Sequence, residues 1–372
     1  MLGGHKAQGG GKVGFAHAWG AKEDHIFSIF QEAHGGQFVD LALVNRGLEG
    51  EIEVIQGFLD GEAGLLFDKP GSESILKHLQ RLGIVCYTGE NNRSACSPSR
   101  AQISVEGILK MNSMIIDFHT HPYLSGKEFL NFYPECFTPS PAQCKTDLER
   151  AGISMICGSV LLKEPYRREE GFAYIRQCNK QAVALKNIFG GFYVPGIHVH
   201  PDFVDESIAE IEEMYAQGIR LIGELVPYLH GWSDYSNRNL SKILDAAGKR
   251  HMVVSFHTMP DEQDEMTRMV LEHPDVTFVA AHPGDRAVYM KHLERMEQCG
   301  NLCLDLSGTG IFRYGAITYG VERVGSERFL FGTDYPICNP RMYVQAIYQE
   351  PISEADRENI MHRNVERLLG LK

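Results

Sequence analysis

The sequence lacks several features that would place it in common functional classes. Its 372 residues contain no apolar run of the roughly 18 residues that a membrane-spanning helix needs. Acidic residues outnumber basic ones, which gives a formal net charge of −12, whereas affinity for nucleic acid comes mainly from basic surface. These absences predict a protein that binds neither membrane nor nucleic acid and whose partners are small molecules.

Cysteine is scarce and odd in number. The nine cysteines are scattered through apolar contexts such as Ile153–Cys157, which indicates reduced thiols and a cytoplasmic protein. Residues 1–11 are rich in glycine and lack the apolar core and cleavage site of a signal peptide, so we expect a flexible tail. These glycines also lack the GxxxxGK(S/T) spacing of a phosphate-binding loop.

From Met114 onward, short apolar runs alternate with amphipathic segments, as is typical of buried parallel strands covered by helices. In the helix predicted over Asp205–Gln217, for example, Glu210, Glu212 and Glu213 are expected to face outward. Eight strands are predicted: Met114–Phe118, Ile153–Val160, Gly191–Val199, Ile219–Val226, Met252–His257, Val276–Ala281, Leu302–Leu306 and Phe329–Gly332. Eight such units in about 250 residues predict an α/β fold, a (β/α)8 TIM barrel. A doubly wound open sheet is the alternative, but the chain has no dinucleotide fingerprint.

The residues before the barrel follow a different pattern. Residues 12–90 show a βαββαβ-type alternation, which predicts a small α+β, ferredoxin-like domain. A linker at 91–110 would join it to the barrel domain at 111–372. The stretch Leu59–Pro70, with the helix and strand after it, resembles the second half of ACT-type regulatory domains. The alternative is an unrelated α+β domain used for dimer contacts, which would make the protein a homo-oligomer.

The strongest signal is an apolar strand that ends in a His-x-His motif, His119 and His121. Strand side chains alternate between faces, so both imidazoles project from one face, at the mouth of the barrel. Three further ligand-capable residues, His257, His282 and Asp334, end later strands. Each alone is readily explained as a buried histidine or a helix N-cap aspartate. Five around one barrel mouth predict a site for a divalent ion such as zinc, manganese or iron.

These features resemble the amidohydrolase superfamily, specifically its amidohydrolase 2 branch. The resemblance rests on His119 and His121, on single histidines after strands five and six, and on the Gly-Thr-Asp-Tyr-Pro signature at Gly332–Pro336. It extends from the first predicted strand to a C-terminal helix at Glu354–Leu369. It implies a barrel that binds one or two divalent ions, with the first two histidines and Asp334 among the ligands.

Strand four bears on the number of ions. Many relatives have a carboxylated lysine that bridges two metals at this place, whereas others, including TatD-like nucleases, have a glutamate in a Gly-Glu setting. Glu224 stands in such a setting and is a candidate bridging ligand. The alternative is that Glu224 forms an ion pair with Arg220 or Arg286.

A second His-x-His pair, His198 and His200, ends strand three. The family pattern has no ligand at this place, so we expect the pair to support the site or contact substrate rather than to form a second metal cluster. Cys299 and Cys303 lack the two-residue spacing of a thiolate metal site, so we interpret them as core residues.

The resemblance implies a metal-dependent hydrolase that uses a metal-activated water on a carbonyl-type small molecule, namely an amide, lactone or ester. Zinc is the first expectation for the ion, with manganese or iron as alternatives. Asp334 would accept the proton of the water and then protonate the leaving group. Arg286 and Arg313 would hold a substrate carboxylate, and Tyr228 would line the substrate face.

The same branch contains non-oxidative decarboxylases of aromatic acids, which gives the main alternative: a lyase acting on an aromatic or unsaturated carboxylic acid. There a single ion orients the carboxylate, and His282 would help to transfer the proton. A bridging Glu224 favours the hydrolase. A ligand sensor whose barrel has lost activity is a third interpretation, and the filled ligand positions argue against it.

Overall fold

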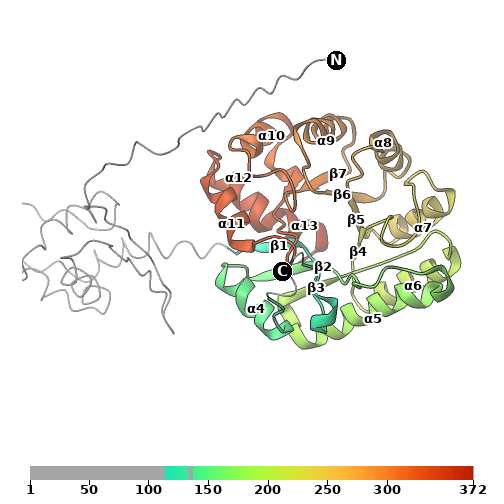
Figure 1. Cartoon of the computed structure of the whole chain (residues 1–372). Helices are drawn as coiled ribbons and strands as arrows, with labels where there is room; N and C mark the ends of the chain where they lie inside the picture. The colour runs from blue at the N-terminus through green and yellow to red at the C-terminus, as the bar shows by residue number, and fades with distance from the viewer. Residues whose placement is uncertain (1–113, 132, 134–136, 372) are drawn as a thin grey trace, which may run out of the picture. The chain divides into compact units, whose positions relative to one another are not determined.

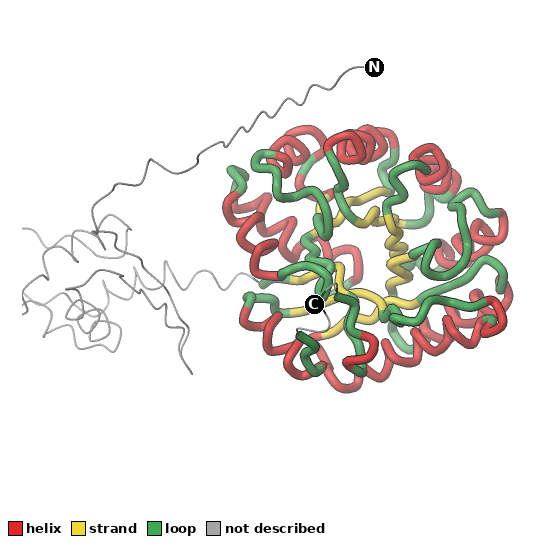
Figure 2. The backbone as a smooth tube through the Cα atoms, viewed as in Figure 1, coloured by secondary structure: helices red, strands yellow, loops and turns green. Residues whose placement is uncertain are grey.

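The computed structural model describes residues 114–131, 133 and 137–371, so the predictions made for residues 1–110 lie outside it. Eight parallel strands form one sheet in chain order. They are β1 (Ile116–Thr120), β2 (Met155–Ser159), β3 (Tyr193–Ile197), β4 (Leu221–Leu225), β5 (Val253–His257), β6 (Thr277–Ala281), β7 (Leu302–Asp305) and β8 (Phe329–Leu330). The strands form an inner ring with helices outside it, as the barrel prediction requires (Figure 2).

Helices follow each strand and cover the ring (Figure 1). They are α4 (Pro141–Arg150), α5 (Phe172–Phe189), α6 (Val204–Ala216), α7 (Arg238–Lys249), α8 (Gln263–Glu272), α9 (Arg286–Gln298), α10 (Ala316–Val324), α11 (Pro340–Gln349), α12 (Glu354–Glu358) and α13 (Asn364–Leu369). The sequence explains how α7 packs on the ring: apolar residues recur at helical spacing on one face, and all are buried, namely Leu240, Ile243, Leu244 and Ala247. No helix in the described part of the chain is long and apolar enough to cross a membrane.

The ring closes where the segment after β8 meets β1. The Phe118 amide donates to the Phe331 carbonyl (2.8 Å), and the Asp334 amide donates to the His119 carbonyl (2.8 Å). The second of these bonds joins the backbones of two residues that the sequence predicts as metal ligands. Closure of the barrel therefore also fixes the distance between these two parts of the site.

Apolar side chains fill both the inside of the ring and the space between strands and helices. The inner cluster contains Ile116, Phe118, Cys157, Leu221, Val253, Val279, Cys303 and Leu330 together with Val365 and Leu369 of α13. Cys299 belongs to the outer cluster. Both Cys299 and Cys303 are therefore core residues, as expected. The inner cluster supports the strand ends at the mouth from below, so the site rests on a packed core.

The predicted strands are all present, but most are shorter than expected. The prediction Phe329–Gly332 corresponds to β8, which ends at Leu330, and the prediction Met114–Phe118 begins before β1. The apolar runs continue past the paired residues because the flanking loops are buried too: Phe331, for example, is fully buried. Hydrophobicity therefore marks burial rather than strand pairing at these ends.

The expectation that Glu210 faces outward is wrong, while Glu212 and Glu213 are exposed as predicted. Glu210 is buried at the contact of α6 with α5, where it accepts hydrogen bonds from Asn179 Nδ2 (3.2 Å) and Arg176 Nε (3.3 Å). A buried carboxylate needs such partners, and they come from a helix that the pattern of α6 alone does not reveal.

The predicted C-terminal helix Glu354–Leu369 contains a π-helical turn, η6 (Asn359–Arg363), between α12 and α13. The carbonyl of Ile360 in this turn accepts a hydrogen bond from the Phe331 amide (2.9 Å). The turn therefore connects the last helical segment to the chain that leaves β8 and carries Asp334.

Candidate metal centre

Four side-chain atoms from three strand ends meet at the barrel mouth. His119 Nε2 and His121 Nε2, at the end of β1, lie 3.2 Å apart. Glu224 Oε2, from β4, lies 3.5 Å from each of these nitrogens. Asp334 Oδ1, from the loop after β8, lies 3.6 Å from His119 Nε2 and 3.5 Å from His121 Nε2. We call these four atoms the first cluster.

The first cluster fits a divalent ion. The corners of a tetrahedron with metal bonds of about 2.0–2.1 Å lie roughly 3.3 Å apart, close to the measured separations of 3.2–3.6 Å. Asp334 Oδ1 is buried and has no hydrogen-bond partner among the described residues. A buried carboxylate oxygen without a partner is costly, and a cation would satisfy it. Two imidazoles with two carboxylates are also a chemistry that zinc, manganese and iron accept.

Simple alternation along β1 does not explain how the two histidines reach the mouth. Ile116 and Phe118 face the barrel interior, so strict alternation would turn His119 and His121 outward. The pairing of β1 with β2 is irregular between Asp117 and Thr120, and this irregularity reorients the strand end. The pairing of β4 with β5 is irregular in the same way between Ile222 and Leu225, the stretch that contains Glu224.

Both imidazoles of the first cluster are oriented through their other ring nitrogen. His119 Nδ1 lies 2.9 Å from Asp305 Oδ2, and a carboxylate can only accept, so Nδ1 carries the hydrogen. His121 Nδ1 likewise donates to the Ser159 carbonyl (3.1 Å). In the neutral imidazoles, Nε2 is therefore the nitrogen without a hydrogen and presents its lone pair to the cluster, which is the arrangement that metal-binding histidines use.

A second group of side chains lies on the other side of Glu224. Glu224 Oε1 is 2.8 Å from His257 Nδ1 and 3.5 Å from His282 Nε2. We call these three atoms the second cluster. The His257 side chain is 22% exposed and that of His282 is 14% exposed, whereas that of Glu224 is 4% exposed. The second cluster therefore forms the solvent side of the site, and it too contains side chains that could hold a metal ion.

His282 takes an unusual backbone conformation with φ of 72°, and Asp334 does the same with φ of 62°. Positive φ is uncommon outside glycine and occurs often at functional sites. The Ser307 hydroxyl donates to Asp305 Oδ1, so its oxygen accepts from His282 Nδ1 (2.9 Å). In the neutral imidazole of His282, Nε2 is therefore the nitrogen without a hydrogen, and it faces Glu224.

The charges of the site depend on one another. Burial alone would raise the pKa of Glu224, but the facing imidazoles of His119 and His257 lower it well below its usual value. Burial lowers the pKa of His119, and the carboxylates of Asp305 and Glu224 raise it well above its usual value. Glu224 is therefore a carboxylate, and the surplus of buried negative charge favours a cation between the side chains.

Two aspartates of the site were not singled out in the sequence. Asp305 orients His119 directly and His282 through Ser307. Asp117 accepts hydrogen bonds from the Thr333 amide (3.0 Å) and hydroxyl (2.5 Å), and burial raises the pKa of Asp117 to about 7 against these bonds. The available signal was a single aspartate in an otherwise apolar strand, because such a residue needs buried partners.

His198 and His200 are fully buried and belong to neither cluster. His198 Nε2 donates to the Val160 carbonyl (2.9 Å), and His200 Nε2 donates to the His230 carbonyl (2.8 Å). Burial lowers the pKa of His198 to about 4, so it is neutral. The pair connects the loops after β2, β3 and β4, and a second metal cluster is not formed there.

The alternative interpretation of Glu224, an ion pair with Arg220 or Arg286, is wrong. Arg220 donates to the carbonyls of Tyr215 (2.8 Å) and Ile219 (3.0 Å), and its guanidinium stacks on the Tyr215 ring. Arg286 is exposed and makes no ion pair with any carboxylate in the described ranges. Glu224 instead faces only histidines at ion-pair distance among these residues.

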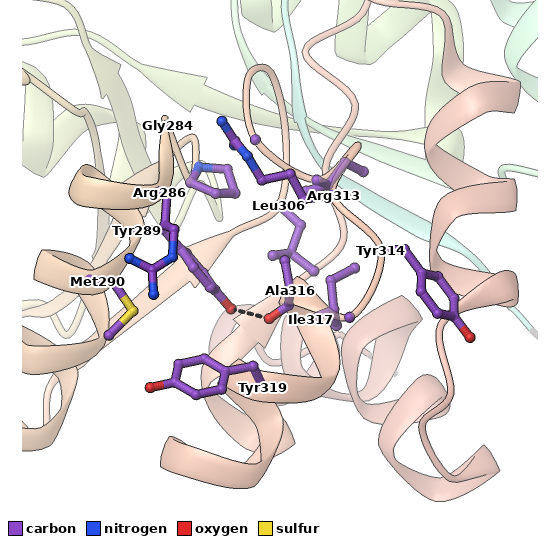
Figure 3. Close-up of a pocket in the computed structure, with 14 residues that line it drawn as sticks. Gly284, Arg286, Tyr289, Met290, Leu306, Arg313, Tyr314, Ala316, Ile317 and Tyr319 are labelled. Carbon is purple, nitrogen blue, oxygen red and sulfur yellow. Dashed lines mark hydrogen bonds between the residues drawn. The ribbon is translucent and has the colours of Figure 1, made fainter.

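A cavity of about 270 Å³ lies between the first turns of α9 and the segment that leads into α10 (Figure 3). Arg286 at the start of α9 and Arg313 before α10 both border it, and neither guanidinium is ion-paired within the described part of the chain. Its walls include Pro283 and Leu306, the chain neighbours of His282 and Ser307. The third predicted substrate residue, Tyr228, is 58% exposed, and its ring lies 5.3 Å from that of His257.

Comparisons with known proteins agree with this architecture. The amidohydrolase family model matches residues 116–371. A 2,6-dihydroxybenzoate decarboxylase from Rhizobium is similar with a TM-score of 0.54 and 14% identity, covering 70% of this chain and 99% of that one. A 5-carboxyvanillate decarboxylase from Novosphingobium aromaticivorans, complexed with manganese, has a TM-score of 0.55 and 14% identity, with 70% and 97% covered.

A probable 2-pyrone-4,6-dicarboxylic acid hydrolase from Acinetobacter baumannii has a TM-score of 0.53 and 14% identity, covering 69% of this chain and 99% of that one. No curated protein matches the chain significantly in sequence. The structural neighbours include both decarboxylases and a hydrolase, so they establish the fold and leave the reaction open. The family match spans most of the described barrel, and the chain therefore belongs to the amidohydrolase family as an enzyme of that superfamily.

Proposed function

We propose that this enzyme is a metal-dependent hydrolase that cleaves an amide, lactone or ester bond of a small molecule. The observation that carries the proposal is the position of Glu224 between two histidine pairs. Its Oε2 lies 3.5 Å from both His119 and His121, while its Oε1 lies 2.8 Å from His257 and 3.5 Å from His282. A carboxylate that presents one oxygen to each pair suits two ions, because it bridges and partly neutralises them.

In this proposal the first cluster would hold one ion, and the second cluster would hold another. Zinc is the ion we propose, with manganese and iron as the alternatives that the same ligands accept. A divalent ion supplies two effects to hydrolysis, since it lowers the pKa of a water molecule toward about 7 and polarises a carbonyl oxygen. Proton transfer and substrate binding are assigned to side chains of the protein.

Asp334 is the proposed proton acceptor and donor. Its carboxylate lies at the edge of the first cluster, with a side chain 10% exposed, so it borders both the histidines and the open side of the mouth. It would accept a proton from the attacking water and return it to the leaving group. His282, whose Nε2 faces Glu224 and lacks a hydrogen in the neutral imidazole, is the other proposed catalytic group.

The substrate is proposed to carry a carboxylate. Arg286 and Arg313 border one cavity and lack ion-pair partners in the described ranges, and a guanidinium binds a carboxylate through paired hydrogen bonds. Tyr228 would contact the substrate from the side of His257. Arg286→Gln and Arg313→Gln are expected to raise KM for a carboxylate substrate and to leave KM for its methyl ester unchanged.

The second candidate is a single-ion decarboxylase, and one distance favours it. The 2.8 Å separation of His257 Nδ1 and Glu224 Oε1 is that of a hydrogen bond and is shorter than the tetrahedral spacing of about 3.3 Å. If that hydrogen bond persists when an ion is bound, the second cluster holds no ion, and His282 would act as a proton carrier for an aromatic acid.

Product analysis separates the two candidates. The full-length enzyme, loaded with zinc or manganese, would be assayed against lactones, amides, esters and aromatic acids, with Asp334→Asn as the inactive control. We expect release of acid from a lactone, amide or ester and no CO₂ from any aromatic acid. Release of CO₂ from an aromatic acid that depends on Asp334 would contradict the hydrolase and establish the decarboxylase.

A further inference from the structure

One side chain joins the strand ends that carry the second cluster. Thr258 directly follows His257 at the end of β5 and is buried. Its hydroxyl donates to the carbonyl of Ala281, the residue directly before His282 at the end of β6. His257 and Ala281 are also the last paired residues of these two strands. The Thr258 hydroxyl therefore continues the contact between the strands one residue beyond the point where the backbone pairing stops.

A buried network fixes the direction of this hydrogen bond. Arg295 NH1 lies 3.0 Å from His292 Nδ1, and a guanidinium can only donate, so His292 Nδ1 is the acceptor. The hydrogen of the neutral imidazole is then on Nε2, which donates to Thr258 Oγ1 (3.1 Å). The threonine oxygen is thereby used as an acceptor, and its own hydrogen is directed to Ala281. Only one arrangement of hydrogens satisfies the whole chain of contacts.

The network contains a buried cation, which lowers the stability of the fold. Arg295 is buried, with 2% of its surface exposed, and it forms no ion pair within the described part of the chain. Three of its other hydrogens go to neutral acceptors: Thr267 Oγ1 (2.8 Å), Gln263 Oε1 (2.8 Å) and the Gln263 carbonyl (3.1 Å). A buried cation without a carboxylate costs stability, whereas an apolar side chain would pack here without that cost. The arrangement is therefore better explained by its effect on the histidines at the strand ends than by stability.

We propose that Thr258, oriented by His292 and Arg295, is a positioning residue for the second cluster. His282 leaves β6 with φ of 72°, a conformation that its own strand does not enforce. A fixed Ala281 carbonyl restricts rotation of the peptide that precedes His282, while Ser307 fixes the imidazole at the other end. The same threonine sets the chain direction immediately after His257. The positions of both histidines of the second cluster thus depend on the Thr258 hydroxyl.

This inference rests on the proposed function, because the second cluster matters most if it holds an ion. The test compares three full-length proteins: wild type, Thr258→Val, which keeps the shape but removes the hydroxyl, and Thr258→Ser, which keeps the hydroxyl. Each is titrated with Mn²⁺ alone and followed by electron paramagnetic resonance. Amide hydrogen exchange of residues 257–260 and 281–285 is measured on the same proteins as purified.

Thr258→Val is expected to bind the first ion as wild type does, to bind the second about 10–100-fold more weakly, and to exchange faster only in the two segments. Thr258→Ser is expected to behave as wild type. Unchanged exchange in Thr258→Val would overturn the inference, and so would equal weakening of both ions. If that variant fails to fold, His292→Phe removes the same contact from the other side and decides by the same readouts. Failure of both to fold would show that the network serves the core and would overturn the proposal.

The two proposals can fail separately. Wild type that takes up one Mn²⁺ at saturation would contradict the two-ion hydrolase. The exchange comparison between Thr258→Val and Thr258→Ser would still decide whether the hydroxyl positions the strand ends, because it does not require a second ion.

Discussion

The two clusters around Glu224 differ in how firmly their side chains are held. In the first cluster the side chains are 2–10% exposed, and both imidazoles are oriented by buried acceptors. In the second, the histidine side chains are 14–22% exposed, and His257 contacts Glu224 directly. In the proposed two-ion site, the barrel would therefore preorganise the position of the first ion and leave that of the second dependent on the loops. We expect the first ion to bind more tightly than the second.

Removal of an imidazole from the first cluster should have the largest effect. His119→Ala or His121→Ala is expected to abolish metal binding and to lower activity by about a thousandfold, since a metal contributes several kcal/mol to the transition state. The fold should persist because the inner apolar cluster lies beneath the mouth. Elemental analysis and circular dichroism would check both statements. Full metal content in the double variant would exclude these residues as ligands.

The next largest effect is expected from the residue that orients the first cluster. Asp305→Asn keeps the shape but weakens the acceptor of His119 Nδ1 and of the Ser307 hydroxyl. Affinity for the first ion should fall by about 10–100-fold, measured by competition with a chelator. Asp245→Asn is a matched control, because that side chain is 61% exposed and pairs with His273 far from the mouth. Equal affinities in the two variants would show that Asp305 does not orient the site.

A smaller effect, confined to the second cluster, is expected from Gly308→Ala. Gly308 has φ of 61°, and an added Cβ would lie 2.4 Å from His282 Nδ1. The imidazole must move, so affinity for the second ion should fall by about tenfold while the first ion binds normally. Gly190→Ala is the matched control, since its φ is 58° and nothing lies within 4 Å of the added atom. Both variants lose about 1 kcal/mol or more to backbone strain, but only the first should change metal binding.

The smallest expected effect is a change in the pH dependence of stability caused by His198, a buried neutral histidine outside both clusters. The folded pKa of His198 is about 4, so between pH 6.5 and 4 the unfolded chain binds a proton that the folded chain does not. Stability from this group therefore falls as the pH falls through that window. With a chelator present, the free energy of unfolding of wild type should decline more steeply than that of His198→Gln, by about 1 kcal/mol per pH unit. Parallel urea-unfolding profiles would contradict this assignment.

The sequence was sufficient for the parts of the molecule that are periodic. Eight apolar runs predicted eight strands in the observed order, and residues at the ends of those runs predicted which side chains meet at the mouth. As a result, the Nε2 atoms of the two histidines, His119 and His121, lie 3.2–3.6 Å from each other and from carboxylate oxygens of Glu224 and Asp334. Parallel strands place all their carboxyl ends at one edge, so position along the chain was enough.

The remaining features depend on contacts between distant residues. Asp305 acts on His119, 186 residues away, and the burial of Glu210 depends on Asn179 of another helix. The irregular pairing after Asp117, which turns the first two histidines inward, also leaves no periodic mark in the sequence. Such features follow from how strands and helices pack, and a pattern read along one segment does not contain them.

The most direct test of the account is the number of ions held by wild type and by Glu224→Gln. Each full-length protein would be titrated with Mn²⁺, with free and coupled ions distinguished by electron paramagnetic resonance. We predict two ions per chain with a coupled signal in wild type, and one uncoupled ion with loss of hydrolysis in Glu224→Gln, because the bridging oxygen pair is gone. One ion in wild type, or two coupled ions in Glu224→Gln, would contradict the role of Glu224 as the shared ligand.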